Sequence, residues 1–104
     1  MNTGNALATE YAGLIRHRLG ARVREIILFG SRARGDAEEA SDYDCVVVVD
    51  RKTPDVREAI LDADVAMLDR HERLFAALLY SENEWQRAKN FPLGWNILKE
   101  GVVL

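Results

Sequence analysis

The sequence predicts an α/β fold in which a small sheet packs against helices. Two short runs rich in β-branched residues, at residues 23–29 and 42–49, are typical of strands. The segments that precede and follow them carry apolar residues at helical spacing. Helical segments that alternate with short strands are typical of helices layered on one sheet.

The first helix is expected between Leu7 and Leu19. Thr3 or Asn5 is placed to cap its start, and Gly20 is placed to end it. The apolar residues of this segment recur at the spacing of one helix face: Leu7, Tyr11, Leu14, Ile15 and Leu19.

The two predicted strands differ in their expected burial. Residues 23–29 form a short β-branched run that stops at Gly30 and Ser31. Residues 42–49 end in four consecutive valines, Val46 to Val49. A continuous valine run is typical of a strand that is buried on both faces, so we expect this strand to be central.

A second long helix is expected to begin at Pro54, with Thr53 as its cap. The polar break at residues 69–73 favours a third strand at residues 74–80, although this run alone could also continue the helix. Two sets of apolar residues form the expected buried stripe of the helix, a main row of Val56, Ile60, Ala63 and Met67 and a widening row of Leu61, Val65 and Leu68.

The last quarter of the chain predicts two short helices. Ser81 and Glu84 have the spacing of a capping box, which indicates a helix over residues 82–89. Residues 92–99 form the second helix, which Gly101 ends. Residues 102–104 are too short to assign, and the whole chain, residues 1–104, is expected to be one domain.

Composition and charge exclude several classes of protein. A net charge of −3 argues against binding nucleic acid by charge alone, so nucleic acid is not an expected partner. Apolar runs are too short to span a bilayer, and the first residues lack the pattern of a signal peptide. Because no targeting signal is recognised in the sequence, the expected location is the cytoplasm. One cysteine, Cys45, excludes a disulfide within the chain.

Residues between the first two strands have the chemistry of a phosphate site. Gly30 lets the backbone leave the strand and approach a ligand without a Cβ in the way. Ser31 follows at the start of a helical turn, where its hydroxyl and the backbone N–H groups can bind phosphate oxygens. Arg32 and Arg34 add positive charge and hydrogen-bond donors beside the same position.

Two carboxylates open the second strand. Asp42 and Asp44 are two residues apart, so strand alternation places both on one face and Tyr43 on the other. Two like charges at this spacing repel each other, and a divalent cation relieves the repulsion. We expect the chain to return after the first strand and to bring these carboxylates to the phosphate site. This arrangement is typical of phosphoryl transfer.

Each half of this pattern also has an ordinary structural interpretation. Gly-Ser pairs are common at the end of a strand, and Asp-rich segments are common at the beginning of one. The charged residues 32–39 would then form a solvated loop. The joint order of strand, Gly-Ser, Asp-x-Asp and strand favours the functional interpretation.

The run GSRARGDAEEASDYDCVVVVD, residues 30–50, resembles the signature of the DNA polymerase β-like nucleotidyltransferase superfamily. Within it, the run is most similar to the minimal nucleotidyltransferases of bacteria and archaea, which are often encoded beside a HEPN-domain protein as an antitoxin–toxin pair. The resemblance includes Arg34-Gly35 and Ser41-Asp42. It is strong over residues 26–50 and implies a small, mixed, nucleotidyltransferase-like sheet.

The resemblance also implies a chemistry and a partner. Gly30 and Ser31 would hold the triphosphate of a nucleotide, with ATP the expected substrate, and Asp42 and Asp44 would bind Mg²⁺ and act in catalysis. The acceptor would be a hydroxyl group, which in toxin-paired members is a tyrosine of the HEPN-domain partner. Modifying it would silence the toxin. A homo-oligomer is left open.

The sequence departs from the family pattern at a third carboxylate, which active members carry on the strand beside the Asp-x-Asp strand. That position is expected at Phe75 or Ala77, neither of which can bind a metal. Glu72 and Asp69 lie nearby in the sequence as weaker substitutes. Two alternatives to the enzyme therefore remain: a binding protein or antitoxin that acts by contact, and a structural domain in which residues 30–44 are only a turn.

The remaining candidate residues carry ordinary expectations. His17 is expected to be solvated, His71 lacks convincing zinc-ligand neighbours, and Cys45 is expected to be a buried core residue. Trp85 and Trp95 are expected to anchor a core or an interface. The aromatic segment at residues 91–95 is the expected contact for a partner protein.

Overall fold

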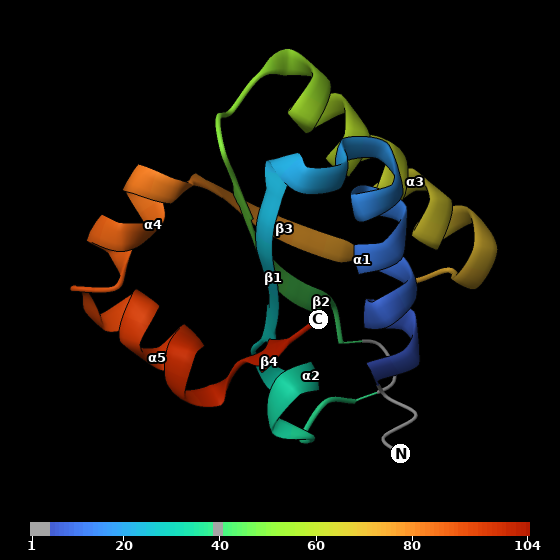
Figure 1. Cartoon of the computed structure of the whole chain (residues 1–104). Coiled ribbons are helices and arrows are strands. Elements are labelled where there is room, and N and C mark those ends of the chain that lie inside the picture. Colours follow the sequence, from blue (N-terminus) through green and yellow to red (C-terminus); the bar gives the residue numbers. More distant parts are fainter. Residues whose placement is uncertain (1–4, 39–40) are drawn as a thin grey trace.

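The computed structural model describes residues 5–38 and 41–104, in which a four-stranded sheet lies between two groups of helices. In Figure 1, α1 and α3 lie on one side of the sheet, and α4 and α5 lie on the other. The elements are α1 (Ala6–Leu19), η2 (Gly20–Arg22), β1 (Val23–Phe29), α2 (Ser31–Arg34), β2 (Tyr43–Val49), α3 (Pro54–His71), β3 (Phe75–Ser81), α4 (Glu82–Ala88), α5 (Pro92–Glu100) and β4 (Val102–Val103).

The sheet is mixed, with the strand order β3-β2-β1-β4. β1 pairs with β2 and with β4 in antiparallel fashion, whereas β2 and β3 are parallel. Parallel neighbours need a long crossover, and α3 supplies it. The predicted small mixed sheet with helices packed against it is therefore confirmed.

Alternating residues of the strands supply two apolar clusters, one on each face. The larger cluster, under α1 and α3, includes Tyr43, Cys45 and Val47 of β2. The smaller cluster, under α4 and α5, includes Val46 and Val48 of the same strand. Both faces of β2 are thus buried along the valine run, which confirms that this strand is central.

The predicted elements form, with small shifts at their ends. β2 begins one residue later than expected, at Tyr43, so Asp42 lies just before the strand. The ambiguous run at residues 74–80 is a strand over Phe75–Ser81, and the capping box of Ser81 and Glu84 is present. Residues 102–103, which the sequence left unassigned, form the edge strand β4.

Two predicted helix caps are not made. Asn5 and Thr53 occupy N-cap positions, but neither side chain caps its helix. The Thr53 Oγ1 instead accepts a hydrogen bond from the Arg22 Nη2 at 2.7 Å. Thr3 lies outside the described residues. Gly20 ends α1 as predicted, with a φ of 56° that suits glycine.

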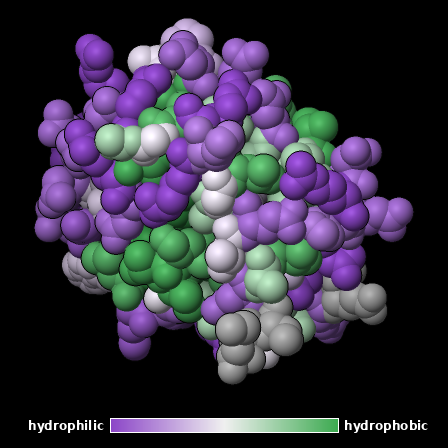
Figure 2. All heavy atoms as spheres, turned by 45° about the vertical axis from the view of Figure 1, so that its right-hand side comes forward, coloured by the Kyte–Doolittle hydropathy of each residue, from purple (hydrophilic) through white to green (hydrophobic). Residues whose placement is uncertain are grey.

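The expected buried stripe of α3 is only partly buried. Its main row packs against the sheet, but Leu61, Val65 and Leu68 are 60%, 57% and 48% exposed, so the prediction that they widen the stripe is wrong. Figure 2, which turns the side with α1 and α3 toward the viewer, shows apolar surface gathered in patches among polar side chains. Of the described helices, none has the length and apolar character needed to cross a membrane.

Candidate active site

Gly30 lies where β1 ends and touches the start of β2. Its φ of 74° and ψ of −157° belong to a region that side chains other than hydrogen rarely adopt. The preceding residue, Phe29, pairs with Asp44 in the ladder. A Cβ added to Gly30 would lie 2.8 Å from the Asp44 Oδ2, so the positive φ favours glycine here and a larger residue would displace the Asp44 carboxylate.

A single helical turn, α2, begins directly after Gly30. Backbone N–H groups of Ala33 and Arg34 both donate to the Gly30 carbonyl at 3.1 Å, and Gly35 ends the turn with a φ of 84°. The first N–H groups of a helix have no acceptor within the helix. The turn therefore presents its positive end, with Ser31, beside the Asp44 carboxylate.

Asp44 lies on the sheet face that α4 and α5 partly cover, and Asp42 lies just before the strand, near enough for its charge to act on Asp44. Tyr43 between them is buried in the cluster on the opposite face, as strand alternation requires. Asp44 precedes Val46 and Val48 on its own face, where the apolar cluster begins. Asp42 is exposed and Asp44 is partly buried, so the pair opens to solvent at the end of the strand.

The two carboxylates are electrostatically coupled. Burial raises the pKa of Asp44 above its ordinary value, and the negative charge of Asp42 raises it further. Hard oxygen donors of this kind suit Mg²⁺, which is usually held by one or two carboxylates together with water and phosphate oxygens. The donor set at this position therefore fits a single divalent cation that would relieve the repulsion.

Arg32, expected beside the phosphate site, is engaged on the other side of the strand. Its guanidinium lies 4.4 Å from the centre of the Tyr43 ring. Its Nε and Nη2 donate to the Ser41 carbonyl at 3.2 and 2.8 Å. Because Ser41 precedes Asp42, this side chain fixes the backbone that carries the first carboxylate.

Arg34 is exposed and bound to carboxylates of two different segments. Its Nε lies 3.2 Å from the Asp36 Oδ2, and its Nη1 lies 3.1 Å from the Glu100 Oε2. The hydrogen bonds that it donates to Asp36 and to Glu100 raise the pKa of Arg34. The second ion pair ties the end of α5 to α2, so α5 borders the site. Nothing in the sequence around Glu100 indicated that this residue would lie near Arg34.

The neighbour of Asp44 on β3 is Ala76, which corrects the expected position of the third carboxylate. Asp44 pairs with Ala76 in the parallel ladder, and Ala76 is exposed. Phe75 and Ala77 point to the opposite face, where they join the cluster under α1 and α3. The prediction of Phe75 or Ala77 was therefore wrong by one residue, which inverts the facing.

Neither suggested substitute completes a metal cluster. Glu72 ends α3 in the left-handed region, with a φ of 54°, and Asp69 is exposed on the same helix. Within residues 5–38 and 41–104, no three His, Cys, Asp or Glu side chains are grouped so that they could hold a metal. Among the described residues, the candidate site therefore offers the carboxylates of Asp42 and Asp44 without a third grouped ligand that could hold a metal.

An aromatic stack beneath β2 was missed by the sequence analysis. Tyr11 and Tyr43 stack on either side of Phe75, with ring centres 4.3 and 4.5 Å away. The Tyr11 hydroxyl donates to the Asp64 Oδ1 at 2.6 Å. With Arg32 on its outer end, the stack supports the start of β2 from behind. Sequence periodicity could indicate that Tyr11 is buried, but not which rings it would meet.

The other candidate residues mostly have structural roles. His17 is exposed as expected, and the His71 Nε2 lies 3.0 Å from the Glu10 Oε1. Cys45 is buried as expected, and burial raises the pKa of its thiol, which disfavours the reactive thiolate. Trp85 is buried in the smaller cluster, whereas Trp95 is 58% exposed.

Sequence comparison finds one matching family and a similar full-length protein. The profile described as "Nucleotidyltransferase domain" matches residues 10–91. A protein of Methanocaldococcus jannaschii named "Putative protein adenylyltransferase" is 32% identical over 104 residues, which cover 100% of this chain and 99% of that protein.

Solved structures share the fold. A "putative nucleotidyltransferase" from Sulfolobus solfataricus is 26% identical, with a TM-score of 0.53, and the match covers 93% of this chain and 75% of that one. A toxin–antitoxin structure with AMP-PNP is 15% identical, with a TM-score of 0.63, and the match covers 90% of this chain and 69% of that one. At that identity, the second likeness concerns the fold alone.

Proposed function

This chain belongs to the nucleotidyltransferase family, and we propose that it transfers a nucleoside monophosphate, with ATP the expected donor, to a hydroxyl group of a partner protein. The observation that carries the proposal is the contact between Gly30 and Asp44. It joins a glycine turn of the kind that accepts phosphate to a pair of carboxylates of the kind that accepts a divalent cation.

The proposed nucleotide site is the turn that follows β1. Gly30 lets the turn lie close to the Asp44 carboxylate, and Ser31 would supply a hydroxyl and an N–H to a phosphate at the positive end of α2. Arg34 would exchange its exposed carboxylate partners, Asp36 and Glu100, for phosphate oxygens. Arg32 would act by holding Ser41 and hence Asp42, rather than by binding phosphate in its present position.

The proposed metal is Mg²⁺, held by Asp42 and Asp44. Such a cation would offset the charge on the phosphate groups during transfer. The ladder between β1 and β2 pairs Phe29 with Asp44 and so holds this carboxylate next to the glycine turn. Arg32 holds the Ser41 carbonyl just before Asp42. Because burial and Asp42 already raise the pKa of Asp44, a bound cation would also lower that pKa.

A protein acceptor is supported by the relative named "Putative protein adenylyltransferase". The proposed partner is a HEPN-domain toxin whose tyrosine hydroxyl is modified, so that this chain acts as its antitoxin. The proposed contact is the aromatic segment at residues 91–95, where Phe91 and Trp95 are 63% and 58% exposed. α5 borders the site through the ion pair of Glu100 with Arg34.

A second candidate function is an antitoxin that binds its partner without transferring a nucleotide. The observation that favours it is Ala76, which occupies the position beside Asp44 where a third carboxylate would lie. Without that carboxylate, the residues of the site that the structure describes offer no third carboxylate to accept the proton of the attacking hydroxyl. Nucleotide binding would then be regulatory or vestigial.

The deciding experiment is a transfer assay with α-labelled ATP, Mg²⁺ and the product of the adjacent reading frame as acceptor. Asp42→Asn/Asp44→Asn would be assayed in parallel, with Asp69→Asn as a matched control at an exposed carboxylate outside the site. Parallel reactions with α-labelled GTP, CTP and UTP would identify the preferred nucleotide.

Three results separate the candidates. Label on the partner that disappears only in the double variant would establish transfer by this site. A silenced partner without label would favour the binding antitoxin. Mg²⁺-dependent nucleotide binding that is unchanged in the double variant would overturn both the metal site and the proposed mechanism.

A further inference from the structure

The two edges of the sheet differ in how they are protected. β4, at one edge, has only two residues. β3, at the other edge, has seven residues, and the run from Leu74 to Tyr80 contains neither a charged residue nor a proline. Proteins usually shorten, charge or cover such an edge, because its unpaired backbone groups invite another strand. β3 thus has the character of a strand that pairs with another chain.

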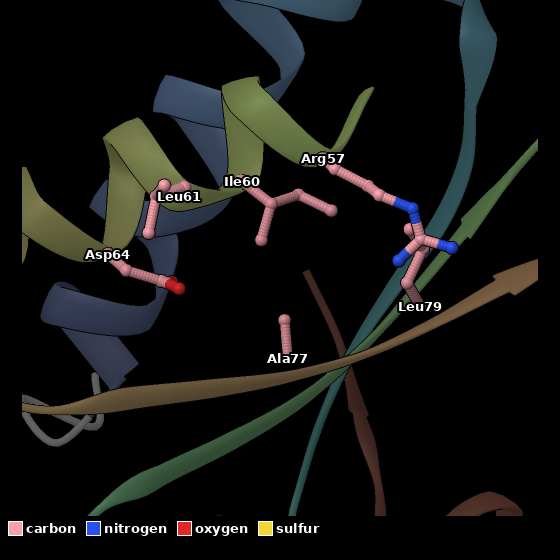
Figure 3. Close-up of a pocket in the computed structure, with 6 residues that line it drawn as sticks. All are labelled: Arg57, Ile60, Leu61, Asp64, Ala77 and Leu79. Carbon is pink, nitrogen blue, oxygen red and sulfur yellow. The ribbon is translucent and has the colours of Figure 1, made fainter. Parts of the chain in front are cut away.

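A groove runs beside this edge, between α3 and β3 (Figure 3). Its volume is about 180 Å³. In Figure 3, Arg57 and Asp64 extend from two points along α3, with Ile60 between them, Leu61 above Asp64 and Ala77 below. Leu79 completes the lining. The groove is therefore apolar along its middle and charged at its two ends.

The flank of α3 that borders this groove carries the apolar residues of the helix that are not buried in the core. Leu61, Val65 and Leu68 are 60%, 57% and 48% exposed. Arg57, Leu61, Asp64 and Leu68 recur at the spacing of one helix face. The exposed stripe therefore lies beside the unprotected edge strand, and the two form one continuous surface.

The charged residues of this surface lie in an order that would be complementary to a second copy related by a two-fold rotation. Arg57 is exposed and forms no ion pair with any residue of the described part of the chain. Asp64 accepts the Tyr11 hydroxyl through one oxygen, and burial raises its pKa. Arg57 and Asp64 lie at nearly equal distances along α3 on either side of Leu61. A two-fold rotation near Leu61 would therefore bring each arginine opposite an aspartate.

We propose that a second copy of this chain binds here, with β3 pairing with β3 of the second copy in antiparallel fashion and Arg57 of each copy facing Asp64 of the other.

Strand and helix geometry agree on a single symmetry axis. Antiparallel strands in one sheet are related by a two-fold axis perpendicular to the sheet, which keeps both α3 helices on the same face. An axis at Leu78 places Ala77 opposite Leu79 of the second copy, so a small side chain meets a large one twice. Asp44 lies on the opposite face and Asp42 lies before the start of β2, so the proposed dimer does not cover the candidate site.

The test is a charge exchange read by analytical ultracentrifugation over a concentration series. Arg57→Glu alone should place two carboxylates together at each contact with Asp64 and weaken the dimer, and Asp64→Lys alone should place two cations together. Juxtaposed like charges cost several kcal/mol, so each dissociation constant should rise by at least about tenfold. An equimolar mixture of the two variants should dimerise again, because every pair at the interface is then of opposite charge.

Two further variants separate the interface from the fold. Leu78→Lys should also yield monomers, because it charges the exposed edge strand without removing a core residue. Arg87→Glu, which makes the same charge change on α4, should dimerise like the wild type. Circular dichroism checks that each variant is folded, and Asp64→Asn, which retains an acceptor for Tyr11, replaces Asp64→Lys if that variant does not fold.

Restored dimerisation in the mixture, together with loss in Leu78→Lys, supports the proposal. Where Asp64→Asn must be used, the supporting result is a dimer that Arg57→Glu weakens less in the Asp64→Asn background than in the wild type. A wild-type chain that stays monomeric over the series overturns it. A dimer that survives both Arg57→Glu and Leu78→Lys also overturns it, because the contact then lies elsewhere. A HEPN-domain protein that binds the wild type but not Leu78→Lys, with no self-association, would assign this edge to that partner instead.

Discussion

The two faces of the sheet perform different tasks with alternate residues of the same strands. Under α1 and α3, the sheet buries the larger cluster, which includes the stacked rings of Tyr43 and Phe75. Under α4 and α5, the buried cluster is smaller and stops at Val46. Beyond Val46 on that face lies Asp44, and Asp42 lies just before the strand, so the pair is open to solvent. The first face holds the strand in place, and the second leaves its end available for a ligand.

The comparison explains how a small domain can carry a charged site. Two neighbouring carboxylates cost stability, since burial and repulsion raise the pKa of Asp44. The opposite face offsets that cost with the stack of Tyr11, Phe75 and Tyr43 and with Arg32 on its end. The neighbouring side chains of Tyr43 and Asp44 therefore lie on opposite faces of the sheet, and mutations on the two faces should have different effects.

The largest effect is expected on the open face. Asp44→Asn or Asp42→Asn removes a carboxylate that would hold the cation, which is worth several kcal/mol to the transition state. At about 1.4 kcal/mol for each tenfold, kcat/KM for nucleotidyl transfer should fall at least about a thousandfold. Circular dichroism should show an unchanged fold. Activity within tenfold of the wild type in either variant would mean that the site lies elsewhere.

The junction between the faces should be the next most sensitive position. Gly30→Ala introduces a Cβ 2.8 Å from the Asp44 Oδ2 at a φ of 74°, so it should cost about 1–3 kcal/mol of unfolding free energy. Gly13→Ala is the matched control, because Gly13 lies inside α1 with no atom within 4 Å of the added Cβ. That change should stabilise the fold by about 0.5–1 kcal/mol. Urea unfolding measures both, and equal effects would contradict the close contact at Gly30.

A smaller effect is expected behind the strand. Arg32→Lys keeps the positive charge but loses the two hydrogen bonds to Ser41 and the planar contact with Tyr43. We expect a loss of about 1–2 kcal/mol of stability and a weaker affinity for Mn²⁺, measured by titration calorimetry. Arg87→Lys, at an exposed position on α4, should change neither quantity. Unchanged Mn²⁺ affinity in Arg32→Lys would separate Arg32 from the carboxylates.

The smallest effect is a pH dependence from Asp44. Its pKa in the folded chain lies above the ordinary value of 3.8, so the folded chain binds this proton more tightly than the unfolded chain. Its contribution to stability is therefore complete below 3.8 and is lost as the pH rises through the raised value. Asp44→Asn should remove this decline, whereas Asp69→Asn should retain it. Thermal unfolding between pH 3 and pH 7, in the absence of divalent cations, provides the measurement.

Sequence patterns predicted where the helices and strands lie better than which face of the sheet each strand residue occupies. The β-branched runs and the capping box at Ser81 located strands and helices to within one or two residues. Alternation also placed Asp44 on the face opposite Tyr43, because Tyr43 and the valines fix the facing of β2. The run from Leu74 to Tyr80 is apolar throughout, so nothing in it marks which residues face inward. The third-carboxylate position was therefore misplaced at Phe75 or Ala77 instead of Ala76.

Features that join distant segments could not be predicted from local patterns. The Arg32 side chain was expected beside the phosphate site, yet an accessible carbonyl at Ser41 and the ring of Tyr43 engage it behind β2. The exposed leucines of α3 follow from the sheet's limited width, since β3 is its last strand. β4 was not predicted because two residues are too few to show the alternating pattern of a strand. Only their pairing with β1 makes them a strand.

Burial of one tryptophan and exposure of the other make this chain spectroscopically useful. Trp85 packs with Val46 and Val48, on the strand and the face that end in Asp44, and Tyr80 lies 5.3 Å from its ring. Trp95 is exposed to water. A buried indole emits at shorter wavelength than a solvated one, so Trp95→Phe would leave Trp85 as the single tryptophan, beneath the candidate site. The protein thus contains its own optical reporter of what binds on that face.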